Sequence, residues 1–212
     1  MHANYTKDYK SIPRSNQGFT LIEIMIALAL GLLIIGAAFA YFLSTLATSK
    51  AILAQSQLQQ EIRATADLMQ RDLRRAGYRP NDSSVNVGTI YLGKTNPSLA
   101  SDNCVIYSYI NERNALRVSG FLLHNNKMYM YTNSTTATTA CPASANTDTN
   151  WSAITLGNRN KITLFNPSYD GSGSRPLLRL SIKGELSNDA AASFELAQQI
   201  TLQNAPVQAS AI

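Results

Sequence analysis

Hydrophobic residues are distributed unevenly along the 212-residue chain, and their pattern divides it into three parts. The first part contains no charged residue from Ile24 to Ser49 and is apolar on every side of a helix. About 20 such residues are enough to span a bilayer. A helix that is hydrophobic all round has to be surrounded by lipid or by other helices. The pattern therefore predicts a hydrophobic transmembrane or assembly helix over residues 19–49.

The helical signal continues beyond residue 50, but with a single apolar face. Apolar residues recur there at three- and four-residue steps, which is the period of a half-buried helix. They are Ala51, Ala54, Leu58, Ile62, Ala66, Met69, Leu73 and Ala76. Gly77 suits a left-handed cap and Pro80 cannot continue the helix. We therefore expect one helix from residue 19 to about residue 76, whose amphipathic half, within residues 50–79, packs against a domain.

After Pro80 the pattern changes to short runs of branched and aromatic residues, which are typical of strands. Strands are expected at 88–92, 105–110, 116–123, 127–132, 151–156 and 161–165, a turn at 167–176, and period-two strands through 178–182 and 194–202.

Two connections in this part of the chain are recognisable. Asn125-Asn126 suits a tight hairpin turn, and residues 133–150 form a polar, low-complexity loop. Six to eight antiparallel strands with one apolar face need another element packed on that face, and the amphipathic half of the helix supplies it. The predicted fold class is therefore α+β, a long N-terminal α-helical spine packed on an antiparallel β-sheet head domain over residues 80–212.

Composition and charge narrow the possible functions. The formal net charge is +5, of which the first eighteen residues contribute +2, and the remaining +3 is too small to indicate nucleic-acid binding. The sequence contains no recognisable nucleophile motif, phosphate loop or set of metal ligands, so it predicts neither an enzyme nor a cofactor or metal site. The basic segment 71–79 suits contact with phosphate. Arg74 and Arg75 are equally explained by the partial negative charge at the C-terminal end of the helix, which favours basic residues there.

The two cysteines, Cys104 and Cys141, have no metal-ligand spacing. If the N-terminal segment directs export, the compartment is oxidising and a disulfide between them is expected. The alternative is two unrelated thiols. A bridge would close a loop of 38 residues. Such a bridge stabilises the folded state by roughly 4 kcal/mol, because it lowers the entropy of the unfolded chain.

One residue does not fit a simple apolar helix. Glu23 lies at the start of the membrane-length run, where a charge costs from about 3 to more than about 10 kcal/mol at the bilayer centre. A transmembrane anchor, a buried core helix and a secretory signal cut after Ala38-Phe39-Ala40 all leave it unexplained.

The segment Gly-Phe-Thr-Leu-Ile-Glu, residues 18–23, followed by the long apolar helix, resembles the type IV prepilin signature. In that family a prepilin peptidase cuts after the glycine and methylates the new N-terminal residue. The resemblance implies that residues 1–18 are a cleaved leader, that cleavage separates Gly18 from Phe19, and that Phe19 is N-methylated. It also implies that Glu23 pairs with the Phe19 amine of a neighbouring subunit. Such pairing matters because an unpaired buried charge costs about 3–5 kcal/mol.

The stretch RDLRRAGYRP, residues 71–80, is similar to the helix end of PilW-type minor pilins and of the related J-type pseudopilins of type II secretion. This resemblance implies a minor type IV pilin that helps prime pilus assembly and sits at or near the pilus tip. The implied partners are the prepilin peptidase, other minor pilins, the major pilin, the inner-membrane assembly platform and a tip adhesin. The implied location is the inner membrane, with a periplasmic head, before assembly and the pilus afterwards.

Two other functions stay open on the sequence. A minor pseudopilin of type II secretion would share every feature above. A competence pilin for DNA uptake would need a basic head, which a charge of +3 argues against. Major pilins are usually smaller and carry their disulfide close to the C-terminus, whereas 71 residues follow Cys141 here, which favours a minor subunit.

Overall fold

The computed structural model describes residues 18–80, 87–96, 98–99, 101–133, 141–142, 150–172, 175–204 and 207–210. Residues 1–17 of the predicted leader 1–18 and most of the predicted polar loop 133–150 lie outside the described residues. The chain divides into two units between Lys50 and Ala51, inside its long helix.

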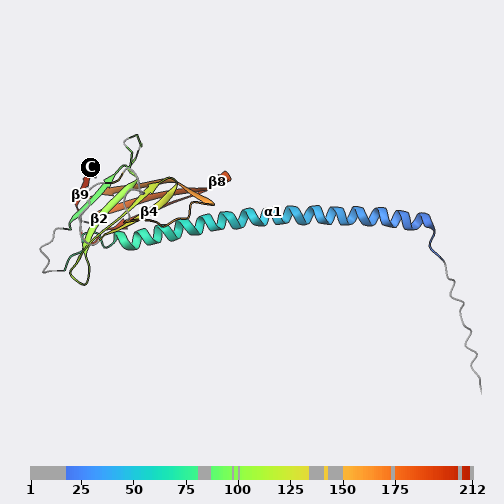
Figure 1. Cartoon of the computed structure of the whole chain (residues 1–212), viewed down its shortest axis with the longest axis horizontal. Coiled ribbons are helices and arrows are strands. Elements are labelled where there is room, and N and C mark those ends of the chain that lie inside the picture. The colour runs from blue at the N-terminus through green and yellow to red at the C-terminus, as the bar shows by residue number, and fades with distance from the viewer. Residues whose placement is uncertain are drawn as a thin grey trace, which may run out of the picture. The chain divides into compact units, whose positions relative to one another are not determined.

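The first unit contains the apolar half of helix α1, which runs from Leu21 to Leu73 (Figure 1). The helix is long and apolar enough to cross a membrane, and none of its most apolar stretch is buried within the chain. Near the end of this half, the hydroxyls of Thr45, Thr48 and Ser49 each donate a hydrogen bond to the carbonyl four residues earlier. These three hydroxyls are thus satisfied inside the helix, which suits apolar surroundings.

The second unit, the head, begins with the amphipathic half of α1. Helical geometry ends at Leu73, and the following turn closes with Gly77 in the left-handed conformation at φ 73°. The Gly77 amide then donates to the Ser108 carbonyl, which ties the helix end to the sheet. The predicted cap is confirmed, and the helix itself is about three residues shorter at this end than expected because its last turn tightens.

After the helix, the described residues of the head contain nine strands. They are β1 (Thr89–Gly93), β2 (Cys104–Ile110), β3 (Leu116–His124), β4 (Lys127–Asn133), β5 (Trp151–Ala153), β6 (Asn160–Asp170), β7 (Leu177–Leu186), β8 (Asp189–Thr201) and β9 (Val207–Ser210).

These strands form two sheets. A six-stranded sheet has the order β5-β4-β3-β2-β1-β9, and a three-stranded sheet has the order β6-β7-β8. Both Asn125 and Asn126, between β3 and β4, have positive φ, as the predicted tight hairpin requires. All strand pairs are antiparallel except β1 and β9, which are parallel.

The main core lies between the amphipathic half of α1 and the two sheets. Its helix side consists of fully buried Leu58, Ile62, Met69 and Leu73 together with Ala66 and Ala76. Its sheet side includes Ile90, Val105, Tyr107, Phe121, Phe165, Leu178, Leu180, Ile182 and Ile200. One helix stripe therefore joins both sheets into one unit.

Gly184 on β7 sets how closely the helix approaches the three-stranded sheet. A Cβ atom at this position would lie 2.9 Å from Ile62 Cδ1 and 3.2 Å from Leu58 Cδ1. It would also lie 3.1 Å from the Lys161 carbonyl oxygen. The absence of a side chain thus permits the close contact between α1 and β7.

The structure corrects the strand pattern in several places. The predicted turn at 167–176 starts later, because β6 continues through Pro167 to Asp170. The strand that starts at Trp151 ends at Ala153, three residues earlier than expected. The strand β9 was not predicted, and its parallel pairing departs from the antiparallel head. Ala51, expected on the buried stripe, is exposed, because burial of α1 begins at Leu58.

The head also has a second apolar cluster, on the opposite face of the six-stranded sheet. It contains Cys104, Ile106, Val118, Leu122, Tyr131 and Trp151. Alternate residues of a strand point to opposite faces, and β2 accordingly sends Val105 and Tyr107 to the main core. The expected single apolar face is thus wrong for this sheet, which buries side chains on both sides.

Candidate functional site

The segment Gly18–Glu23 lies where the chain enters α1. Residues 18–20 are not helical, and the Thr20 carbonyl accepts the amides of Glu23 at 3.1 Å and Ile24 at 3.2 Å. Phe19 is 78% exposed, and a Cβ atom on Gly18 would meet nothing within 4 Å. The Gly18–Phe19 bond is therefore outside the helical hydrogen bonds and is not covered by the other described residues.

Glu23 occupies the first turn of α1 and is exposed. A carboxylate at this end of a helix is favoured by the partial positive charge of the unpaired amides. Among the described residues Glu23 forms no ion pair. The structure thus places Phe19 and Glu23 on the same end of the same helix, while a pairing between subunits stays a prediction.

The surface around this end is almost entirely apolar. Its large side chains remain more than half exposed, among them Ile24, Leu28, Leu33, Ile35 and Phe39. Soluble monomers rarely expose contiguous apolar patches beyond a few hundred Å². This half of α1 therefore needs lipid or other helices around it.

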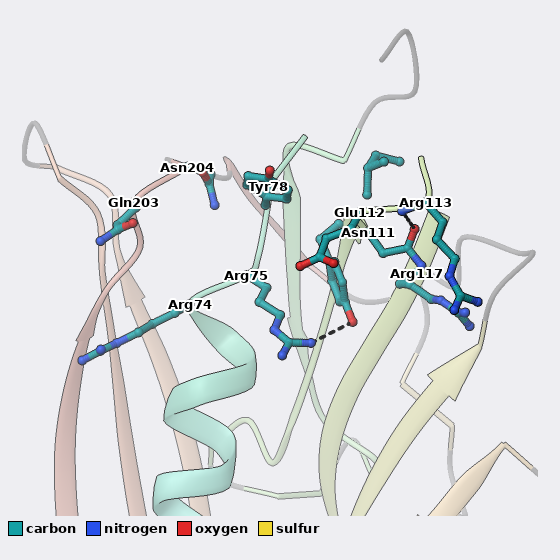
Figure 2. A pocket seen from close by; sticks show the side chains of 11 residues that line it. Arg74, Arg75, Tyr78, Asn111, Glu112, Arg113, Arg117, Gln203 and Asn204 are labelled. Carbon is teal, nitrogen blue, oxygen red and sulfur yellow. Dashed lines mark hydrogen bonds between the residues drawn. The ribbon is translucent and has the colours of Figure 1, made fainter. Parts of the chain in front are cut away.

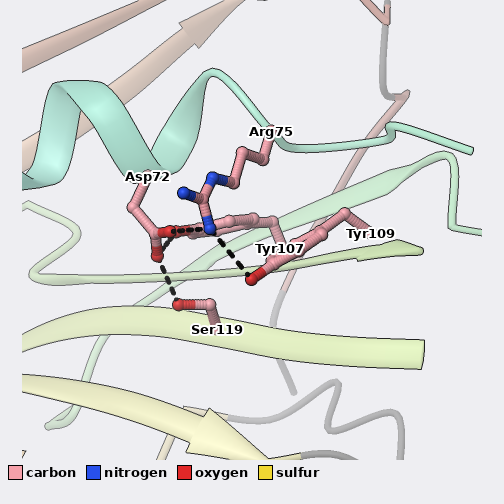
Figure 3. Close-up of polar contacts among 5 residues, drawn as sticks. All are labelled: Asp72, Arg75, Tyr107, Tyr109 and Ser119. Atoms are coloured by element: carbon pink, nitrogen blue, oxygen red, sulfur yellow. Dashed lines mark hydrogen bonds and ion pairs between the residues drawn. The ribbon is translucent and has the colours of Figure 1, made fainter. Parts of the chain in front are cut away.

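A buried polar network secures the other end of α1 to the head (Figure 3). The Asp72 carboxylate accepts hydrogen bonds from the hydroxyl of Tyr107 on β2 and from that of Ser119 on β3, the latter at 2.7 Å. Arg75 Nη1 lies 3.6 Å from the other Asp72 oxygen and donates a 3.4 Å hydrogen bond to the Tyr109 hydroxyl. The network joins the helix end to two central strands.

Burial raises the pKa of the Tyr107 hydroxyl well above its usual value, and the adjacent Asp72 carboxylate raises it further. Tyr107 is therefore a neutral donor to a buried carboxylate. A buried carboxylate without partners would be costly, and this one has two hydroxyl donors and a guanidinium nearby. The network thus lets a charge stay inside the head.

This network was not predicted from the sequence. Its only sequence signal is that Asp72 directly adjoins the apolar stripe, beside Leu73 and one turn from Met69. A second missed contact is Glu61, whose carboxylate accepts hydrogen bonds from the Leu156 amide at 3.2 Å and from the Asn160 side chain.

The two cysteines form a disulfide, with the sulfur atoms of Cys104 and Cys141 2.05 Å apart. The bridge connects the start of β2 to a residue beyond β4. Within the described residues no group of three histidine, cysteine or acidic side chains could hold a metal ion.

Comparison with known proteins bears on both halves of the chain. Residues 51–202 match the family described as prepilin peptidase-dependent protein B. Residues 13–39 match the prokaryotic N-terminal methylation motif, which includes Gly18, Phe19 and Glu23. No curated protein sequence matches the chain.

A type IV-like pilin from Thermus thermophilus has a similar fold. It aligns with a TM-score of 0.51 at 13% sequence identity, covering 70% of this chain and 98% of that pilin. At this identity the likeness concerns the fold alone. It confirms the predicted α+β class, with a long N-terminal helix packed on antiparallel sheets.

Proposed function

Because the chain belongs to the prepilin peptidase-dependent protein B family, we propose that it is a minor type IV pilin that helps prime pilus assembly. A pilin-like protein of this kind is structural rather than enzymatic. The observation that carries the proposal is the division of α1. Its first half exposes an apolar surface with Glu23 in its first turn, and its second half forms one side of the core of the head.

Processing is the first step of the proposed function. A prepilin peptidase cuts between Gly18 and Phe19 and methylates the Phe19 amine, while α1 anchors the protein in the inner membrane. The match of residues 13–39 to the methylation motif supports this step, as does the uncovered Gly18–Phe19 bond. After processing, the new amine lies four residues before Glu23.

Assembly is the second step. Helices of neighbouring subunits cover the exposed apolar half of α1, and Glu23 meets the Phe19 amine of a neighbour. Pairing removes the cost of a buried lone charge, about 3–5 kcal/mol. The partners in this step are other minor pilins, the major pilin and the inner-membrane assembly platform, with a tip adhesin as a further partner.

A position at or near the tip is supported by the head rather than by the helix. A subunit that starts a filament needs helix sides that accept neighbours, but its top need not fit another copy of itself. The 71 residues after Cys141 contain all three strands of the second sheet, so the head extends well beyond its disulfide.

Deletion of the gene tests this role. We expect surface pili to disappear or to fall sharply, and the protein to be a minor component of filaments sheared from the wild type. Electron microscopy and quantitative mass spectrometry measure these two outcomes. Normal piliation would contradict the proposal, and loss of protein secretion with intact pili would assign the chain to type II secretion pseudopilins instead.

The charge pair is tested separately by Glu23→Gln, which keeps the size of the side chain. We expect processed, membrane-inserted protein that co-purifies poorly with other pilins. Asp67→Asn is the matched control, because Asp67 is an exposed carboxylate on the head half of the same helix. Co-purification of Glu23→Gln at the wild-type level would show that the pair is dispensable.

A further inference from the structure

A hollow of about 630 Å³ opens in the head where α1 ends. It is lined by the last turn of the helix, by the β2–β3 turn and by residues that follow β8 (Figure 2). Four of its lining side chains are arginines, namely Arg74 and Arg75 from the helix end and Arg113 and Arg117 from the β2–β3 hairpin. The volume lies in the usual range for small-ligand sites, about 300–1,000 Å³.

The arginines are only partly neutralised within the head. Glu112 is the one acidic residue of the lining, which leaves a formal charge of +3. Among the described residues, Arg75 is the only one of the four with an ion pair, to Asp72. Guanidinium groups remain charged in proteins, so the hollow presents an excess of positive charge that a bound anion would neutralise.

The helix end explains only half of this cluster. Basic residues at a helix C-terminus complement its partial negative charge, which accounts for Arg74 and Arg75. The other pair belongs to the β2–β3 hairpin, with Arg113 in its turn and Arg117 near the start of β3. The Asn111 side-chain oxygen accepts the amides of Arg113 at 3.0 Å and Ala115 at 2.9 Å and so defines that turn.

The central arginine is held in place. Arg75 lies 5.8 Å from the centre of the Tyr109 ring and donates to its hydroxyl, besides its contact with Asp72. In Figure 2, Arg74 lies on one side of Arg75, and Arg113 and Arg117 lie on the other. The positive groups are thus spread across the hollow rather than gathered at one point.

We propose that this hollow binds a small ligand that carries at least two separated carboxylate or phosphate groups. Guanidinium groups bind both kinds of oxyanion through paired hydrogen bonds. Arginines on both sides of the hollow match two anionic groups better than one. This site lies within the head and is separate from the apolar half of α1, so it goes beyond the role in assembly.

Isothermal titration calorimetry of the mature full-length protein in non-ionic detergent tests the proposal. The probes are citrate, a tricarboxylate, and pyrophosphate, with acetate as the single-charge comparison at equal ionic strength. We expect saturable binding of at least one polyanion and none of acetate. Binding of citrate alone identifies carboxylate as the preferred group, and binding of pyrophosphate alone identifies phosphate.

The double variant Arg113→Gln/Arg117→Gln should weaken binding by about tenfold or more, because it removes charge-assisted hydrogen bonds. The matched control, Arg159→Gln/Lys161→Gln, changes the same total charge at residues that do not line the hollow and should bind as the wild type does. Arg113→Lys/Arg117→Lys keeps the charge but not the forked geometry and should bind with intermediate affinity.

Thermal unfolding of each variant without ligand separates a binding defect from a folding defect. Should the glutamine variant unfold, the lysine variant provides the comparison with the wild type. Absence of polyanion binding to the wild type overturns the proposal. Equal loss of affinity in the Arg159→Gln/Lys161→Gln control also overturns it, because binding would then reflect overall charge only.

Discussion

The two halves of α1 belong to one continuous helix but have opposite surroundings. In the head half, Leu58, Ile62, Met69 and Leu73 are fully buried against two sheets. In the apolar half, side chains of the same types are exposed, including Ile34 and Ile35 at 66%. The head half therefore finds its partners in its own chain, and the apolar half does not.

The same contrast holds for the acidic residues of the helix. Asp72 is satisfied inside the head by Tyr107 and Ser119, whereas Glu23 has no ion pair among the described residues. Each large apolar side chain that becomes buried contributes about 1.5–3 kcal/mol. In the head this contribution stabilises the fold, and in the apolar half it is available for association with lipid or with other subunits.

The largest expected effect separates processing from folding. Gly18→Val should block cleavage entirely, since the peptidase has to accommodate the residue before the cut, and the uncut protein should not enter pili. The head should fold normally, because nothing lies within 4 Å of a Cβ atom at Gly18. N-terminal sequencing and the fluorescence of Trp151, the single tryptophan, measure the two outcomes. A mature N-terminus at Tyr41, after the Ala38-Phe39-Ala40 site, would contradict the proposed processing.

A matched pair of isoleucine substitutions tests the contrast directly. Ile62→Ala should lower the free energy of unfolding of the head by about 2–5 kcal/mol, because it leaves a cavity under both sheets. Ile34→Ala should change it by less than about 0.5 kcal/mol, because Ile34 is 66% exposed and belongs to neither apolar cluster of the head. Denaturant titration followed by Trp151 fluorescence measures both values. Similar losses for the two variants would show that the halves do not differ as described.

A pair of glycine substitutions sharpens the comparison. Gly184→Ala should cost about 1–3 kcal/mol, because the new methyl group would press on Ile62, Leu58 and a backbone carbonyl oxygen. A Cβ atom at Gly36, in the apolar half, would meet nothing within 4 Å. Gly36→Ala should therefore stabilise the helix by about 1 kcal/mol, the preference of alanine over glycine in a helix. The same titration gives the first value, and thermal melting of helical circular dichroism gives the second. A neutral Gly184→Ala would mean that α1 can shift away from β7.

The smallest effect concerns Tyr107. Because burial and Asp72 raise its pKa in the folded head, its contribution to stability is complete below about pH 10, the ordinary tyrosine pKa. This contribution is lost as the pH rises above that value. Tyr107→Phe should cost about 1 kcal/mol at neutral pH for the lost hydrogen bond, and its stability should fall less steeply than that of the wild type in alkaline solution.

Denaturant titrations at a series of pH values from neutral to strongly alkaline test this prediction. Tyr78→Phe is the control, because Tyr78 is 46% exposed and its variant should keep the alkaline slope of the wild type. An unchanged slope in Tyr107→Phe would contradict the proposed origin of the pH dependence.

Much of the fold could be predicted because it depends on neighbours in the sequence. The apolar run, the stripe from Leu58 to Ala76, the cap at Gly77 and the hairpin turn at Asn125 are all local patterns. The same holds for the residues around Gly18 and Glu23, which lie within six positions of one another. Local conformation and the local period of hydrophobic residues determine such features.

The tertiary structure alone decided how the strands divide into two sheets and that β9 pairs in parallel with β1. It also decided that Asp72 meets Tyr107 and Ser119, which are 35 and 47 residues away along the chain. Likewise, it brings arginines of the helix end and of the β2–β3 hairpin to one hollow. These features depend on which distant surfaces pack together, and hydrophobic packing is non-directional, so no local pattern specifies them.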